Sequence, residues 1–360
     1  MNKLSQIFKT GLVVVIISIF TLLIGELLVR VFLPQNKMVT WIEMHNEGFV
    51  MNQSGGTAFQ EYGNRKAEYR FNEYRLRGNS VTSSNLNILT IGDSFTFGLL
   101  LNEEDTYVNI LQRKADTVYP DSIQFLNAAV GGSGLADWAL WLDMFGTELD
   151  VDYLIYFMNY DDVNRALSKN LFIYDENSPD SLIKSQRWKP KEFTIKLSKK
   201  GWYRWLQGNS EIANIIVKVL WKHVFFEDLT HNFNPEKSEV SIPTLDSFEI
   251  ESNYSTHLAN SILNKIEDWC DLNGCEFLII NTGFFENETM SIYDQNFYDW
   301  IQKNGEETEG LYFDNNECVQ SNTDSSLSEL KIPGDSHPNE KGAKIITDCT
   351  WEKINPILFH

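Results

Sequence analysis

Residues 86–98 read LNILTIGDSFTFG, and this stretch decides the fold class. An apolar run typical of a buried strand ends at Gly92 and Asp93, and Ser94 follows directly. A side chain at the carboxyl end of a strand in an open α/β sheet faces the crevice in which such sheets bind ligands. Ser94 is therefore a candidate nucleophile, provided that a general base reaches its hydroxyl. The simpler alternative is a serine that caps the helix after the strand.

The candidate base lies near the other end of the chain, in residues 334–342, which read GDSHPNEKG. His337 is expected to accept the proton of Ser94 at neutral pH, and Asp335 to fix the tautomer of the imidazole. Two further polar segments follow strand-like runs. The turn at residues 127–134 contains Gly132, whose backbone N–H can approach a ligand oxygen. The loop at residues 158–162 contains Asn159 and Asp161, of which the asparagine amide would complete an oxyanion hole.

Strand-like runs alternate with helical patterns over most of the chain. The runs lie at 123–127, 153–157 and 276–280, and the helical patterns at 106–113, 138–145 and 340–354. This alternation predicts a parallel, doubly wound α/β sheet in a domain spanning residues 86–360. Residues 35–85 are polar and are interpreted as a stalk and an approach to the domain. Residues 164–255 are too long for one crossover and predict an inserted helical subdomain.

Residues 1–34 carry an apolar run from Gly11 to Leu33, preceded by Lys3 and Lys9. The run is long enough to cross the roughly 30 Å hydrocarbon core of a bilayer as one helix. The lysines before it place the N-terminus in the cytoplasm and the remaining domain outside the cell membrane. An uncleaved anchor is favoured over a cleavable signal peptide because no small-residue cleavage site follows.

Charge and cysteine content narrow the class of protein further. The 360 residues carry a net charge of −20, which argues against nucleic-acid binding. Residues 184–222 depart from this, with ten Lys and Arg against two Glu and five interleaved Trp and Tyr. This segment is interpreted as a solvated helical face, as a surface resting on anionic lipid, or as a groove for an anionic glycan. Four cysteines allow three disulfide pairings, and their spacing suggests no metal site.

The four segments at residues 86–98, 127–134, 158–162 and 334–342, in this chain order, resemble the motif blocks of the SGNH (GDSL-type) hydrolase superfamily. The resemblance covers about residues 86–355. The resemblance implies a flavodoxin-like three-layer α/β/α sandwich with Ser94 as nucleophile, His337 as base, and Gly132 with an asparagine as oxyanion donors. The family usually carries its aspartate three residues before the histidine, where this chain has a glycine. Asp335 lies two residues before it, which leaves a Ser–His dyad as an alternative. The family alignment puts Asp161 at the asparagine position, and Asn159 is favoured as the donor.

The anchor and residues 72–78, which read NEYRLRG, resemble membrane-tethered members associated with envelope polysaccharides. The expected function is that of a membrane-tethered, extracytoplasmic serine acyl-ester hydrolase or O-acyltransferase that acts on an acylated glycan. No metal or organic cofactor is implied, and envelope-polysaccharide assembly proteins are candidate partners. One alternative is a catalytically inactive protein that binds glycan or scaffolds an enzyme. Another is a phospholipase or thioesterase that works at a lipid surface.

Overall fold

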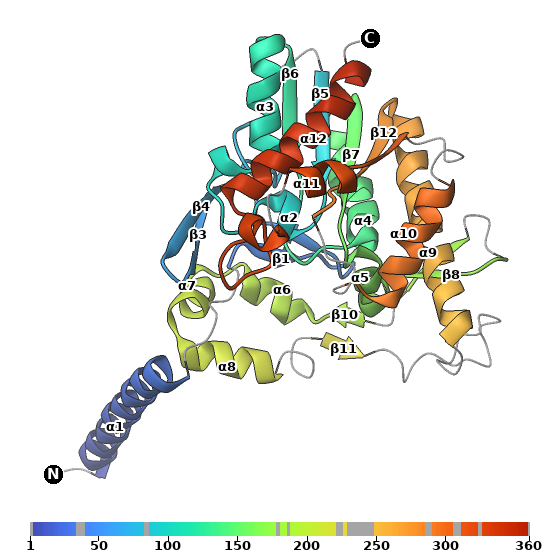
Figure 1. Cartoon of the computed structure of the whole chain (residues 1–360). Coiled ribbons are helices and arrows are strands. Elements are labelled where there is room, and N and C mark those ends of the chain that lie inside the picture. The colour runs from blue at the N-terminus through green and yellow to red at the C-terminus, as the bar shows by residue number, and fades with distance from the viewer. Residues whose placement is uncertain are drawn as a thin grey trace.

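A central sheet of five parallel strands organises the computed structural model (Figure 1). The structure describes residues 3–33, 40–82, 86–177, 181–185, 188–220, 226–228, 248–284, 290–304, 311–322 and 326–358. The strands of the sheet are β5 (Leu86–Ile91), β6 (Ile123–Asn127), β7 (Tyr153–Met158), β12 (Glu276–Asn281) and β13 (Leu311–Asp314). They lie in the order β13-β12-β7-β5-β6, so the first strand in the chain lies between the second and the third. This is the flavodoxin-like order 2-1-3-4-5, and it confirms the predicted fold class.

Helices cover both faces of the sheet, because alternate side chains of each strand point to opposite faces. In β7, Leu154 and Tyr156 join one apolar core, whereas Ile155 and Phe157 join the other. The first core is covered by α4 (Leu135–Phe145), α5 (Asp162–Lys169), α9 (Phe248–Asn273) and α10 (Ile292–Asn304). The second is covered by α3 (Tyr107–Val118), α11 (Asn316–Ser321) and α12 (Glu340–Leu358). Short 3-10 helices occupy Glu103–Asp105, Gly146–Glu148 and Leu327–Leu330.

The segment before the sheet is part of the domain, and this corrects the interpretation of residues 35–85 as a stalk. It forms two antiparallel hairpins, β1 (Ile42–Met44) with β2 (Val50–Asn52) and β3 (Thr57–Tyr62) with β4 (Arg65–Arg70). Trp41 and Tyr69 are buried against Phe97, just after the candidate nucleophile. The strands are short, and their apolar residues alternate with polar ones. The sequence alone therefore does not show that one face of each strand is buried. Residues 35–39 and 83–85 lie outside the described residues.

Between β7 and β12, where the sequence predicts an inserted helical subdomain, the structure describes paired strands and several helices. After α5 come the paired strands β8 (Phe172–Tyr174) and β9 (Leu182–Lys184), and the pair β10 (Trp188–Pro190) and β11 (Phe226–Asp228). The described residues between β10 and β11 form the helices α6 (Glu192–Ser198), α7 (Gly201–Asn209) and α8 (Glu211–Leu220). The last part of the expected insertion begins α9, which covers the sheet. The boundaries of the insertion remain a prediction.

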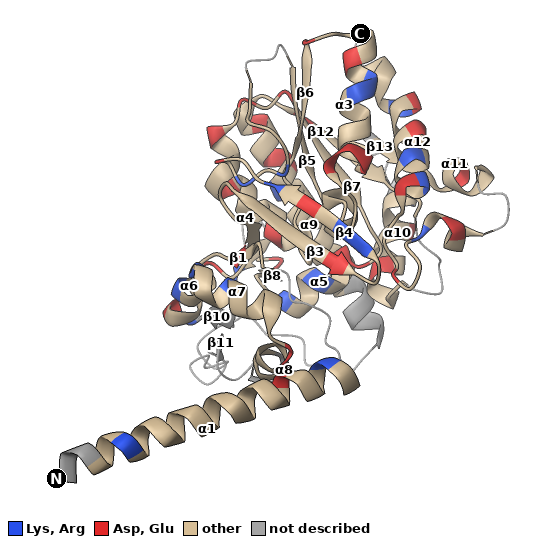
Figure 2. Ribbon diagram, turned by 90° about the vertical axis from the view of Figure 1, so that its left-hand side faces the viewer, with Lys and Arg blue, Asp and Glu red and all other residues tan. Residues whose placement is uncertain are grey.

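One long apolar helix, α1 (Lys3–Phe32), projects from the domain next to α8 (Figures 1 and 2). Its residues Gln6–Phe32 are long and apolar enough to cross a membrane, and none of that stretch is buried in the protein. Figure 2 shows charged residues only toward its two ends. The helix is compatible with the predicted anchor and also with a signal sequence.

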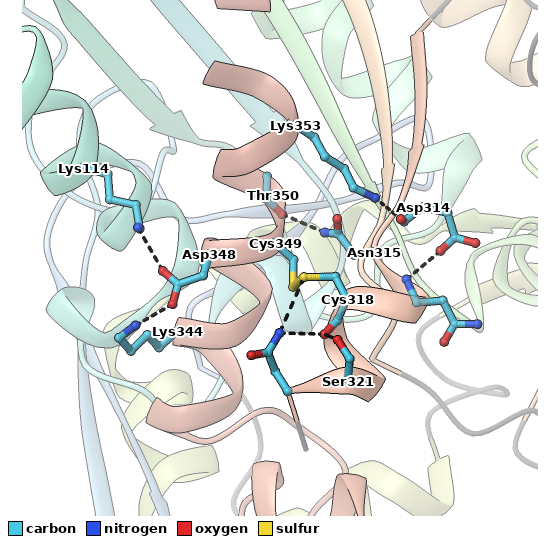
Figure 3. Close-up of a disulfide and its surroundings, with 12 residues drawn as sticks. Lys114, Asp314, Asn315, Cys318, Ser321, Lys344, Asp348, Cys349, Thr350 and Lys353 are labelled. Carbon is cyan, nitrogen blue, oxygen red and sulfur yellow. Dashed lines mark hydrogen bonds and ion pairs between the residues drawn. A yellow bond between two sulfur atoms is a disulfide. The ribbon is translucent and has the colours of Figure 1, made fainter. Parts of the chain in front are cut away.

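A disulfide joins Cys318 of α11 to Cys349 of α12 (Figure 3). The Asn315 amide donates a hydrogen bond to the Thr350 hydroxyl at 2.9 Å beside it. Cys270 and Cys275 are buried free thiols. Of the disulfides that four cysteines allow, the structure therefore contains the one between Cys318 and Cys349. The bridge fixes α12, the helix that follows His337, to the edge of the sheet.

Candidate active site

The turn after β5 places Ser94 at the start of a short buried helix, α2 (Ser94–Phe97). Asp93 caps this helix, because its Oδ1 accepts a hydrogen bond from the Phe95 N–H at 2.8 Å. Gly92 leaves no room for a side chain, since a Cβ there would lie 2.1 Å from Thr96 Oγ1. The close approach of strand and helix thus requires Gly92, and the Asp93 cap fixes the start of the helix at which Ser94 lies.

Ser94, His337 and Asp335 meet in the structure although the serine and the histidine are 243 positions apart in the chain. His337 Nε2 lies 2.7 Å from Ser94 Oγ. On the other side of the ring, His337 Nδ1 is hydrogen-bonded to Asp335 Oδ1. That oxygen also accepts the His337 backbone N–H at 2.9 Å. The three side chains therefore form a continuous serine–histidine–aspartate arrangement.

A turn explains how a carboxylate only two residues before the histidine reaches its ring. Gly334 adopts a positive φ of 80°, and the Asp335 N–H donates to the Ile332 carbonyl at 2.9 Å. The Tyr62 hydroxyl donates to the Gly334 carbonyl and holds the turn from β3. Burial favours the neutral form of Asp335, but the hydrogen bonds and charge of His337 outweigh it and hold the pKa of this carboxyl below its usual range. Asp335 is thus ionised at neutral pH.

The glycine-rich turn after β6 lies beside the serine. Gly131 is the glycine of this turn that lies next to Ser94. A Cβ at Gly131 would lie 3.8 Å from Ser94 Cβ and 3.3 Å from Ile42 Cδ1. Gly132 has a positive φ of 74°, a conformation that favours glycine. Its carbonyl accepts a hydrogen bond from Lys169 Nζ at 2.7 Å. Sequence reasoning selected Gly132 and overlooked Gly131, because the close approach depends on the hairpin before the sheet.

The structure separates the two candidates for the oxyanion amide. Asn159 is buried at the end of β7, and its Nδ2 donates to Asp93 Oδ2 at 3.0 Å, next to the serine. Asp161 accepts from Arg165 Nε at 2.8 Å and from Asn164 Nδ2 at 2.9 Å. Its carboxylate is therefore engaged on α5, whereas the Asn159 amide adjoins the nucleophile turn.

Arg165 on α5 is a part of the site that sequence reasoning missed. Its Nη1 lies 2.7 Å from Asp93 Oδ2 and donates to the Ser133 carbonyl at 3.0 Å. Burial alone would lower the pKa of Arg165. The negative charges of Asp93 and Asp162 outweigh this effect and raise the pKa above its usual value, so the guanidinium stays charged. Burial and the negative charge of Asp93 raise the pKa of Asp162. The only sequence signal for Arg165 is its spacing four residues after Asp161.

The chemistry available here is nucleophilic attack by a hydroxyl with a histidine base. In the part of the chain that the structure describes, no group of three His, Cys, Asp or Glu side chains is arranged to hold a metal ion. The Asp93 carboxylate, fully buried, accepts from a backbone N–H, an amide and a guanidinium. It therefore positions the turn rather than acting as a base.

Comparison with known proteins finds similar folds only among solved structures. No family model and no curated protein sequence matches the chain. The psychrotrophic esterase EstA from Pseudoalteromonas sp. is 14% identical with a TM-score of 0.42, over 76% of this chain and 99% of that one. TesA is 11% identical with a TM-score of 0.41, over 76% and 99%. The acetylxylan esterase Axe2 from Geobacillus stearothermophilus is 15% identical with a TM-score of 0.41, over 75% and 94%.

The strand order defines a flavodoxin-like α/β protein, and its switch point carries a serine–histidine–aspartate arrangement. The motif segments resemble those of the SGNH (GDSL-type) hydrolase superfamily, and the fold is the one that this resemblance implies.

Proposed function

We propose that the protein is a membrane-tethered, extracytoplasmic serine ester hydrolase or O-acyltransferase that acts on an acylated glycan. The single observation that carries the hydrolase part is the 2.7 Å contact of Ser94 Oγ with His337 Nε2, backed by Asp335 on Nδ1. The disulfide supports an exported domain, because such bonds persist in oxidising compartments.

The reaction follows from this geometry. Ser94 Oγ attacks the acyl carbonyl, and His337 Nε2 takes the hydroxyl proton. Asp335 stabilises the imidazolium that forms. The N–H groups of Ser94 and Gly132, with the Asn159 amide, hold the negative oxygen of the tetrahedral intermediate. His337 then returns the proton to the leaving alkoxide, and an acyl group remains on Ser94.

Hydrolysis and transfer differ only in what removes that acyl group. Water gives a free acid, whereas a sugar hydroxyl gives a new ester, and His337 accepts the proton in both cases. The glycan part of the proposal derives from the motif resemblance, and the tether from the apolar helix α1. A catalytically inactive binding protein and a lipid-directed esterase are the competing functions.

The test uses the full chain in detergent, treated with a fluorophosphonate probe and with p-nitrophenyl acetate. Labelling and turnover are expected in the wild type and in Ser336→Ala, which removes an exposed hydroxyl next to His337. Both are expected to disappear in Ser94→Ala and His337→Ala. A folded wild-type protein that is neither labelled nor active would establish the inactive binding protein instead. Ester formation on added acceptor oligosaccharides would then distinguish transfer from hydrolysis.

A further inference from the structure

The apolar helix α1 and the inserted helix α8 are joined through a carboxylate. Glu26 accepts hydrogen bonds from the backbone N–H groups of Glu211 and Ile212 at 2.8 and 3.1 Å, and from the Ser210 hydroxyl at 2.9 Å. Glu26 of one helix thus caps the N-terminus of another. Arg30 pairs with Glu26 at 3.1 Å, one turn further along α1.

This contact fixes the depth at which α8 meets α1. Glu26 lies seven residues before Leu33, the end of the apolar run, which is about 10 Å along a helix. When the run from Gly11 to Leu33 spans a bilayer, Glu26 lies about 10 Å below the end of that run, which is close to the greatest depth to which amphipathic helices bury their apolar face. A carboxylate there is costly unless it has partners, and α8 supplies three donors. The start of α8 is therefore held at the membrane interface.

The helices near this junction expose apolar and aromatic side chains together with lysines. Trp202 and Trp205 of α7 are each more than half exposed, and so are Ile216 and Val219 of α8. The two tryptophans are three residues apart and share one face of α7. Lys196 in α6, which pairs with Glu192 at 2.6 Å, and Lys199 and Lys200 between α6 and α7 are exposed as well. Figure 2 shows Lys and Arg positions on the α6 ribbon. Trp221 and Lys222, which belong to the same basic segment, lie outside the described residues.

Tryptophan, aliphatic side chains and lysine on one surface fit a bilayer with anionic headgroups. Indole rings prefer the interface, aliphatic groups the acyl boundary, and lysines the lipid phosphates. The charge of this segment opposes that of the chain, which is −20 in total. Because α8 packs against α1, α7 against α8 and α6 against α7, a bilayer that holds α1 lies next to these helices.

The surface is also connected to the candidate active site. Arg204 of α7 pairs with Glu43 of β1 and donates to Gln53 Oε1 at 2.8 Å. Glu43 is buried and also binds Arg75 at 2.9 Å. The neighbouring residue Ile42 contacts Gly131 beside the serine. Side-chain contacts and chain neighbours therefore link α7, which carries the exposed tryptophans, to the glycine turn.

We propose that α6, α7 and α8 form a membrane-resting surface that binds the anionic lipid of the bilayer in which α1 is anchored. Glu26 locks this surface to the anchor, so the catalytic domain is held at one height and orientation above the membrane. The inference rests on the tethering part of the proposed function and not on the ester chemistry.

The test measures lipid contact directly and needs no catalytic activity. The full chain is placed in nanodiscs of phosphatidylcholine and phosphatidylglycerol, with or without brominated acyl chains that quench indole fluorescence. Quenching is expected in the wild type and is expected to fall in Trp202→Phe/Trp205→Phe. The matched control Trp351→Phe, on α12, should leave quenching unchanged. Equal quenching in the wild type and in the double variant would overturn the proposal.

Further variants test the lysine charges and the Glu26 contact separately from insertion of the indole rings into the bilayer. Lys196→Glu/Lys199→Glu/Lys200→Glu is expected to reduce quenching in anionic nanodiscs and not in neutral ones. Glu26→Ala is expected to reduce it in both, because the start of α8 then loses the acceptor that joins it to α1. Circular dichroism and thermal unfolding in detergent show that each variant is folded. If an anionic oligosaccharide shifts the emission of the two tryptophans while brominated lipid has no effect, the surface binds glycan and the proposal is wrong.

Discussion

Replacing Asp335 by asparagine tests whether its carboxylate takes part in the reaction. Its Oδ1 accepts both from His337 Nδ1 and from the His337 backbone N–H, so the ring is held in place and its charge is balanced. Asparagine keeps an acceptor oxygen but removes the negative charge. A hydrogen bond to a charged group contributes about 1.5–3 kcal/mol. Each 1.4 kcal/mol corresponds to a factor of ten in rate, so kcat should fall about 10- to 140-fold.

The assay is the steady-state hydrolysis of p-nitrophenyl acetate by the full chain, with KM measured separately. KM should change little, because Asp335 contacts His337 and not the substrate. A second variant, Gly334→Asp/Asp335→Ala, moves the carboxylate to the position usual in the family. It should stay impaired, because Gly334 has a positive φ and the Tyr62 hydroxyl holds its carbonyl. If Asp335→Asn keeps the wild-type kcat while His337→Ala abolishes activity, the site is a Ser–His dyad and this reasoning fails.

Three further predictions concern stability, measured by denaturant unfolding of the full chain in detergent. Arg165→Met should cost about 3–5 kcal/mol, because it leaves the buried Asp93 carboxylate without a cation; the matched change Arg70→Met, in an exposed pair with Glu103, should cost less than about 1 kcal/mol. Cys318→Ser/Cys349→Ser should cost about 3–4 kcal/mol, because the bridge closes a loop of 31 positions. Burial, with the charge of Asp161, raises the pKa of Asp294 to about 6. Its contribution to stability is therefore present below its unfolded pKa and lost as pH rises through about 6, amounting to about 3 kcal/mol, and Asp294→Asn should flatten this pH dependence.

The sequence predicts the sheet well because buried parallel strands are continuous apolar runs, which are visible without knowing their neighbours. The expected strand at 123–127 coincides with β6, and those at 153–157 and 276–280 are each one residue short of β7 and β12. The hairpins before the sheet were not predicted, since their strands are short and their burial depends on Phe97 and on residues far along the chain. Local patterns therefore identify the layers of the domain, and long-range packing decides what covers them.

The same division applies to the candidate site. Ser94 and His337 lie in short motifs whose chemistry is recognisable from residue type and spacing. The reach of Asp335 depends on the turn at Gly334, whose carbonyl is held by Tyr62, 272 positions earlier in the chain. The roles of Arg165 and Gly131 depend on Asp93 and on the hairpin that contains Ile42. Such long-range contacts cannot be predicted from the spacing of residues along the chain.

The separation of the serine from the histidine also has a consequence for folding. Ser94 and His337 are 243 positions apart, so the serine has no base until the segment that contains His337 packs against the turn after β5. Folding intermediates in which only the central strands have formed therefore carry an inert serine. The bridge between Cys318 and Cys349 closes a loop that contains His337, so its formation and the assembly of the site are coupled.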